Sequence, residues 1–217
     1  MKRLVLIIAI LMTIAKISAQ NYDISVYAEP QIAWITSNQG GVESNGSIVH
    51  INAGIELDLF FAKNYAFTMG ICMNNTGGKL LYVSPVSFVQ KGDSLNIPGG
   101  SPLKHNLQYV GIPLGLKLKS EELGYTTFYF HGGLIPMFKT NASTSSESLS
   151  INRTNISADV NLFNLNYFAE AGIEYRLGGN TSLKAGLKWS AGVTDVTKND
   201  LSTNYLNSVG LLLGVLF

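Results

Sequence analysis

The stretch NYFAEAGIEYRL, residues 166–177, alternates polar and apolar side chains with a period of two. Glu170, Glu174 and Arg176 take even positions, and apolar residues fill the odd ones. This period predicts a β-strand with two different faces. A helix is the rival interpretation, but it would place Gly172 and Arg176 on different sides, and Gly172 would weaken it. We therefore interpret the stretch as a strand that carries charges on one face only.

The same alternation recurs along the chain. With residues 163–176, it predicts eight strands, the others being 24–34, 51–61, 65–73, 109–118, 127–138, 183–194 and 208–217. None of the apolar stripes contains a charged residue. After the N-terminal twenty residues no stretch stays apolar for eighteen residues, so the sequence predicts no membrane helix.

The connections between these strands alternate in length. The short ones are 63–64, 120–124 and 178–180, and the long ones are 37–47, 84–103, 140–160 and 195–204. Long loops at one rim and short turns at the other are typical of an even-stranded antiparallel barrel. We expect an all-β, eight-stranded, antiparallel up-and-down barrel.

Side-chain volume decides which face points outward. Each apolar stripe holds about six residues, many of them large, whereas the interior of an eight-stranded barrel is just wide enough for side chains to fill it. The charged fraction is 13%, about half the roughly 25% of a typical soluble domain. We therefore expect a transmembrane barrel with its apolar face in lipid. A soluble, lipocalin-like ligand-binding barrel with an apolar interior is the alternative.

The polar stripes then face the lumen. We expect a paired charge network there, and not an open pore, formed by Glu29, Glu56, Asp58, Lys117, Glu170, Glu174, Arg176, Lys184 and Lys188. Pro30, Pro113 and Pro136 fall inside predicted strands, where each removes a backbone donor. Strand ends or bulges would accommodate them. Gly77-Gly78-Lys79 is interpreted as a turn or a bulge.

The first residues resemble a secretory signal. Lys2 and Arg3 precede the apolar run 4–14, and small residues follow at Ser18-Ala19, a pattern typical of a signal peptide. We expect residues 1–19 to be cleaved, leaving a barrel domain over 20–217. Its net charge is 12 − 14 = −2 with histidines neutral, which gives no basis for nucleic-acid binding. The single Cys72 is interpreted as a packing residue.

Several segments also resemble a known family. These are Ser18-Ala19-Gln20, QYVGIPLGLKLK at 108–119, YFAEAGIEYRLGGNTSLKAGLKWS at 167–190 and the ending SVGLLLGVLF. Together they resemble the PorT-type small outer-membrane β-barrel proteins. The resemblance implies a bacterial outer-membrane location, with both termini in the periplasm and the long loops outside the cell. It also implies outer-membrane lipid as the surroundings, and a role in protein secretion for the named member.

The functional hypothesis is a non-enzymatic integral outer-membrane barrel with a plugged polar lumen and a structural, adhesive or envelope-assembly role. An accessory component of a secretion complex is the alternative, with envelope or secretion proteins as partners. A lipid-modifying barrel enzyme is a further alternative, for which His131 on the lumen face is the candidate. No nucleophile elbow or zinc-ligand spacing accompanies it, and we expect no catalytic residue, cofactor or metal. The sequence leaves the oligomeric state undetermined.

Overall fold

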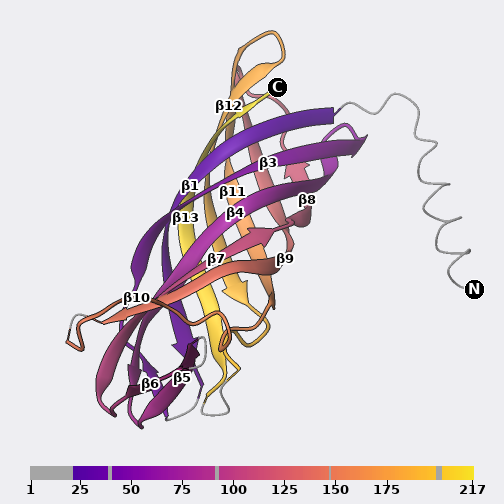
Figure 1. The fold of residues 1–217 in the computed structure, drawn as a ribbon. Helices are drawn as coiled ribbons and strands as arrows, with labels where there is room; N and C mark the ends of the chain where they lie inside the picture. Colours follow the sequence, from indigo (N-terminus) through magenta and orange to yellow (C-terminus); the bar gives the residue numbers. More distant parts are fainter. Residues whose placement is uncertain (1–21, 39–40, 91–92, 147, 199–201) are drawn as a thin grey trace, which may run out of the picture.

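The chain folds into a closed antiparallel β-barrel in the computed structural model, which describes residues 22–217 except 39–40, 91–92, 147 and 199–201. The wall consists of β1 (Tyr22–Ser37), β3 (Ile48–Ala62), β4 (Tyr65–Tyr82), β7 (Ser101–Gly111) with β8 (Leu114–Lys119), β9 (Thr126–Ser146), β11 (Phe163–Gly178), β12 (Thr181–Gly192) and β13 (Asn204–Leu216). Figure 1 shows these strands tilted around one axis.

Each wall strand pairs antiparallel with the next one along the chain. The last strand, β13, pairs with β1 from Ser25↔Leu216 to Ser37↔Asn204. This pairing closes the sheet into a ring, because β7 and β8 together form one of its eight strands. The predicted eight-stranded up-and-down barrel is confirmed. No helix within the described residues is long and apolar enough to cross a membrane.

Pro113 explains why one wall strand has two parts. The register of β9 against this strand is the same at Gly111↔Met137 and at Leu114↔Leu134. The proline interrupts only the hydrogen-bond ladder, and the backbone N–H of Ile112 still donates to the carbonyl of Pro136 at 2.9 Å. Pro30 and Pro136 lie within β1 and β9 without a shift in register.

The outside of the barrel carries an apolar belt. Leu187 is 65% exposed, and Ile173 and Leu211 are exposed as well, whereas Glu170 and Lys188 are buried. This arrangement contradicts the lipocalin-like alternative, which requires the opposite orientation. Cys72 is buried and free, next to Tyr27 and Leu212, as expected of a packing residue.

The two ends of the barrel differ. At the short-turn end, two-residue turns join β3 to β4 and β11 to β12, and a six-residue turn joins β8 to β9. The long-loop end carries the remaining strands, β2 (Val42–Ser44), β5 (Val86–Gln90), β6 (Asp93–Ile97) and β10 (Ile151–Asn155). In Figure 1 these lie at the lower end, opposite the C-terminus.

The strands extend further toward the long-loop end than the sequence predicts. β4 continues to Tyr82, β7 begins at Ser101 and β9 continues to Ser146, so parts of the predicted loops 84–103 and 140–160 are strands. The Gly77-Gly78-Lys79 prediction is wrong, because β4 passes through it in constant register with β7. Gly77 has φ 147° and approaches the carbonyl of His105 too closely for a Cβ, which explains a glycine within the strand. The predicted signal peptide, residues 1–19, lies outside the described residues.

Candidate functional site

The lumen near the short-turn end contains a group of ion pairs around Lys117. The Lys117 ammonium lies 2.6 Å from Asp58 Oδ2 and 2.5 Å from Glu174 Oε1. The Lys119 ammonium lies 2.6 Å from Glu174 Oε2, and the hydroxyl of Thr68 donates to Asp58 at 2.6 Å. The groups come from β3, β4, β8 and β11, so the contacts join strands across the interior.

A second group surrounds Lys184 further along the axis. Its ammonium lies 2.9 Å from Glu56 Oε2 and 3.2 Å from Glu170 Oε1. The Tyr129 hydroxyl donates to Glu170 at 2.6 Å. The Tyr129 ring lies 4.9 Å from Lys117 Nζ and 5.0 Å from Lys184 Nζ, within the range of cation–π attraction. Tyr129 therefore links the two groups.

A third pair joins Lys188 to Glu29 at 3.1 Å. The Lys188 ammonium also lies 5.4 Å from the ring of Phe168 and 5.7 Å from that of Tyr27. A buried charge is tolerated only when it is paired and hydrogen-bonded. The three groups meet this requirement because each lysine contacts a carboxylate.

Local sequence places these side chains together. Lys184 and Lys188 are four residues apart on β12 and therefore face the same side, as do Glu170 and Glu174 on β11. The register pairs Glu170 with Lys188 and Glu174 with Lys184. Between them, Gly172 pairs with Gly186, and a Cβ at either glycine would collide with the Tyr129 hydroxyl. The two glycines create the space that Tyr129 occupies.

Beyond these groups the interior changes from charged to apolar. Toward the long-loop end the lumen side of the wall carries a buried cluster that includes Ile35, Leu80, Tyr82, Leu103, Leu107, Tyr109, Ile135, Met137 and Leu206. A hydrogen bond of 3.2 Å joins Tyr82 Oη and His105 Nε2. Burial lowers the pKa of His105 to about 4 and raises the pKa of Tyr82, because each charged form would lose its hydration.

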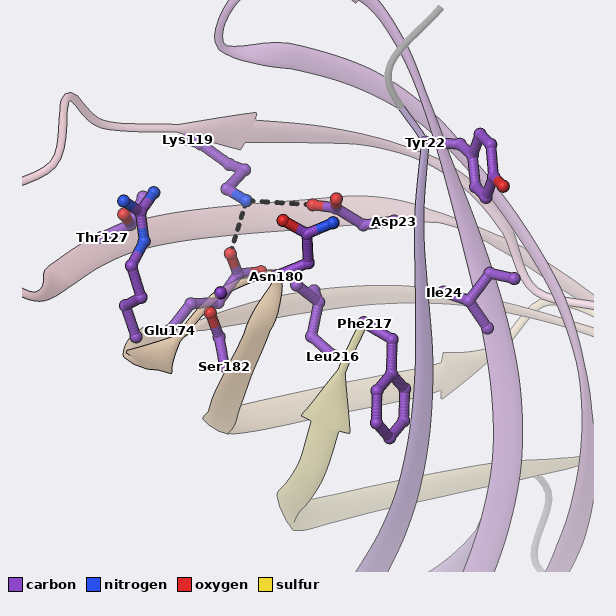
Figure 2. A pocket seen from close by; sticks show the side chains of 12 residues that line it. Tyr22, Asp23, Ile24, Lys119, Thr127, Glu174, Asn180, Ser182, Leu216 and Phe217 are labelled. Atoms are coloured by element: carbon purple, nitrogen blue, oxygen red, sulfur yellow. Dashed lines mark hydrogen bonds and ion pairs between the residues drawn. The ribbon is translucent and has the colours of Figure 1, made fainter.

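The short-turn end opens into a cavity of about 770 Å³. Figure 2 shows Lys119 between Asp23 and Glu174, with Asn180 and Ser182 nearby. The Lys119 ammonium lies 3.4 Å from Asp23 and 2.6 Å from Glu174. The charged groups at this mouth are therefore already engaged with one another.

The structure buries eight of the nine predicted lumen residues; Arg176 differs. Its side chain is 55% exposed and lies 2.9 Å from Glu122 in the β8–β9 turn. Arg176 keeps the register of β11 against β12 and lines the cavity at the short-turn end. It therefore lies on the predicted lumen phase, but at the open mouth and outside the buried network. Sequence reasoning missed Asp23 and Lys119, which lie on the lumen-facing phase of β1 and β8 beyond the predicted network.

Glu56, His131 and Glu170 are the group within the described residues that could hold a metal ion. Their ligand atoms lie within 4.8 Å of one another, and all three residues are buried. The Lys184 ammonium already contacts one oxygen of each carboxylate, so it supplies the positive charge that a metal ion would bring. His131 Nδ1 lies 3.8 Å from Glu170, and neither ring nitrogen has a hydrogen-bond partner. A serine–histidine pair of the kind that a hydrolase needs is therefore not formed at His131.

A closed antiparallel barrel with an apolar belt outside and ion pairs inside defines an integral β-barrel membrane protein. The family model described as "Outer membrane protein beta-barrel domain" matches residues 14–205. The chain belongs to this family, which places it in the bacterial outer membrane.

One solved structure supports the fold, and two others are similar over most of their length. Neisserial surface protein A is 14% identical, with a TM-score of 0.54 over 92% of this chain and 98% of that one. OprG from Pseudomonas aeruginosa is 10% identical, with a TM-score of 0.43 over 91% of this chain and 95% of that one. Ail of Yersinia pestis is 13% identical, with a TM-score of 0.41 over 90% and 98%. A search of curated proteins found no match.

Proposed function

We propose that the protein is a non-enzymatic, non-conducting outer-membrane barrel that displays its long-loop end outside the cell. The observation that carries the proposal is the filling of the interior. The three groups around Lys117, Lys184 and Lys188 occupy successive levels of the lumen. The apolar cluster that includes Leu80 and Tyr109 fills the interior on the long-loop side of these groups. An ion would have to displace paired charges first and then enter an apolar interior.

Single-channel recording tests this proposal. The purified barrel, refolded in detergent and added to a planar lipid bilayer, should give no stepwise conductance over several hundred millivolts. Insertion would be verified by recovery of heat-modifiable protein from liposomes of the same lipid. Reproducible ohmic steps from the wild-type protein would overturn the sealed lumen.

The proposed orientation has both termini in the periplasm. Its support is that β1 starts and β13 ends at the short-turn end, where the backbone N–H of Ile24 donates to Phe217 at 3.0 Å. Short turns face the periplasm in barrels of this type. A cysteine introduced at Ser87 should react with a membrane-impermeant maleimide on intact cells, and one at Asn64 should react only after lysis. The reverse pattern would refute the orientation.

The long-loop end supports a recognition or adhesive role. Its strands continue beyond the apolar belt, and they enclose an apolar cluster that holds them in place. A partner would therefore meet a preformed surface, which lowers the entropy cost of binding. The PorT-type resemblance of residues 109–114 instead suggests secretion. Crosslinking followed by pull-down from native membranes distinguishes the adhesive role from the secretion role, since the secretion role requires stable association with envelope proteins.

A further inference from the structure

The outer wall of the long-loop end contains a groove of about 590 Å³ between β3, β4, β7, β9 and β10. Five of its nine lining residues carry amide side chains, namely Asn75, Asn106, Gln108, Asn141 and Asn155. Arg153 also lines it, and no acidic residue does. The lining is therefore polar and rich in amides, and Arg153 is its one permanent charge.

The groove lies on the outside of the wall. On β7, Asn106 and Gln108 alternate with Leu107 and Tyr109, which are buried in the interior cluster. It also begins where the apolar belt ends. Along β4, exposed Met73 is two residues from Asn75 and points to the same side. The amides therefore occupy the zone immediately beyond the lipid-facing residues.

The lining is partly fixed and partly free. Gln108 Nε2 donates to Asn75 Oδ1 at 3.2 Å, and Asn75 Nδ2 donates to the carbonyl of Ile51 at 2.8 Å. Within the described residues, the side chains of Asn106 and Asn141 make no hydrogen bond, and Arg153 has no acidic partner. The groove thus combines an ordered amide pair with unengaged donors and acceptors.

Two irregularities of the sheet shape this groove. The register of β7 against β9 shifts between Gln108 and Tyr109, which gives β9 one extra residue at Thr140. The register of β10 against β9 shifts between Ile151 and Thr154. Within that second shift, Arg153 has φ 43°, a left-handed conformation that is strained in a non-glycine residue. Bulges re-aim side chains and concentrate near functional sites.

We propose that this groove binds an anionic saccharide. An amide offers donors and an acceptor together and so complements sugar hydroxyls, which also do both. Arg153 would receive the phosphate or carboxylate of the sugar, for which a guanidinium has matching geometry. The absence of acids from the lining leaves nothing to repel that anion. The sugar could belong to a glycolipid of the outer leaflet or to a soluble oligosaccharide.

The experiment uses the full barrel and two probes. The first is a phosphorylated lipopolysaccharide core oligosaccharide, deacylated to be water-soluble and titrated against the barrel in detergent. The second is intact lipopolysaccharide in nanodiscs. Arg153→Gln should weaken binding about 10-fold or more, because it removes a charge-assisted hydrogen bond, and Asn141→Leu should weaken it severalfold. Lys79→Gln is the matched control, since Lys79 is exposed on β4 but does not line the groove, and it should change binding less than twofold.

The two probes distinguish the sources. Binding of the soluble oligosaccharide supports the groove whichever way the barrel is oriented. Binding of intact lipopolysaccharide alone, weakened by Arg153→Gln, supports a glycolipid and rests on the proposed outward placement of the long-loop end. The proposal is overturned if neither probe binds, or if Arg153→Gln and Asn141→Leu bind as tightly as Lys79→Gln. Because these are surface substitutions, heat-modifiable gel mobility can verify that each variant folds.

Discussion

The Lys184 ammonium on β12 lies 2.9 Å from the Glu56 carboxylate on β3, across the interior of the barrel. The two residues are 128 positions apart in sequence and both are buried. They are separated around the wall by β13 and β1. The pair therefore ties together strands that share no backbone hydrogen bond.

Removal of one partner of this pair should be costly. Lys184→Met leaves Glu56 and Glu170 without their ammonium, and an unpaired buried charge costs about 3–5 kcal/mol. Urea unfolding of the barrel from lipid vesicles measures the loss. Lys63→Met is the control, because the Lys63–Glu121 pair is 79% and 64% exposed and such pairs contribute at most about 1 kcal/mol. Equal losses for both variants would contradict the role assigned to the buried pair.

Space around the Tyr129 hydroxyl gives a second prediction. Gly186→Ala places a methyl group against that hydroxyl, and overpacking of this kind costs about 1–3 kcal/mol. Tyr129→Phe in the same chain should recover part of the loss, since it removes the colliding oxygen. The free energy of unfolding of the two single variants and the double variant forms a cycle. Strict additivity of the two losses would show that the residues do not interact.

The sequence predicts the wall of the barrel because burial in lipid imposes one rule on every strand. Alternation identifies Glu170, Lys184 and their neighbours as lumen residues, and it identifies Ile173 and Leu187 as lipid-facing. It cannot identify which lysine meets which carboxylate, because Lys184 and Glu56 meet only after the ring closes. It places Arg176 on the lumen phase but cannot show that Arg176 lies at the open mouth, where the side chain stays exposed.

Alternation predicts the long-loop end less well than the wall, for a physical reason. Beyond the belt the outer face meets water and becomes polar at Lys79 and Lys104, while the inner face becomes apolar at Leu80 and Leu103. The alternation of polar and apolar residues persists, but beyond the belt the polar residues face outward and the apolar residues face inward. A pattern search for apolar residues outside and polar residues inside therefore stops early and assigns these strand ends to loops.

The apolar belt gives a third prediction. Leu187→Arg puts a cation on the lipid face, which costs about 2–4 kcal/mol near the bilayer midplane. Leu123→Arg is the matched substitution, because Leu123 is similarly exposed but lies in the β8–β9 turn at the rim, and it should cost about 1 kcal/mol or less. Folding yields and unfolding free energies in liposomes measure both. A Leu187→Arg barrel as stable as Leu123→Arg would argue against lipid contact at Leu187.

His105 gives a pH-dependent prediction. Burial lowers its pKa from the ordinary 6.5 to about 4, so the unfolded chain binds a proton more readily than the folded barrel. The contribution of neutral His105 to the free energy of unfolding is complete above pH 6.5. It is lost as the pH falls toward 4, by about 3 kcal/mol in total. Among the described residues that line the same small cavity, the other ionisable groups are Tyr82, which is hydrogen-bonded to His105, and Asp159.

The comparison of wild type with His105→Gln isolates this effect. Both proteins would be unfolded with urea at several pH values between 4 and 7.5, and the difference between their stabilities should change with pH. Across this window the wild type should lose stability more steeply on acidification than His105→Gln. Parallel pH profiles would show that His105 does not titrate differently in the folded and unfolded states.

Three consecutive leucines on β13 allow the most direct test of barrel orientation. Leu211 and Leu213 are 43% and 48% exposed, whereas Leu212 between them is fully buried. Each would be replaced by cysteine in a Cys72→Ala background, spin-labelled while unfolded and refolded into lipid vesicles. Collisions with lipid-dissolved oxygen should be frequent at positions 211 and 213 and rare at 212. Frequent collisions at 212 with rare ones at 211 and 213 would contradict a barrel with its apolar face in lipid and its charges inside.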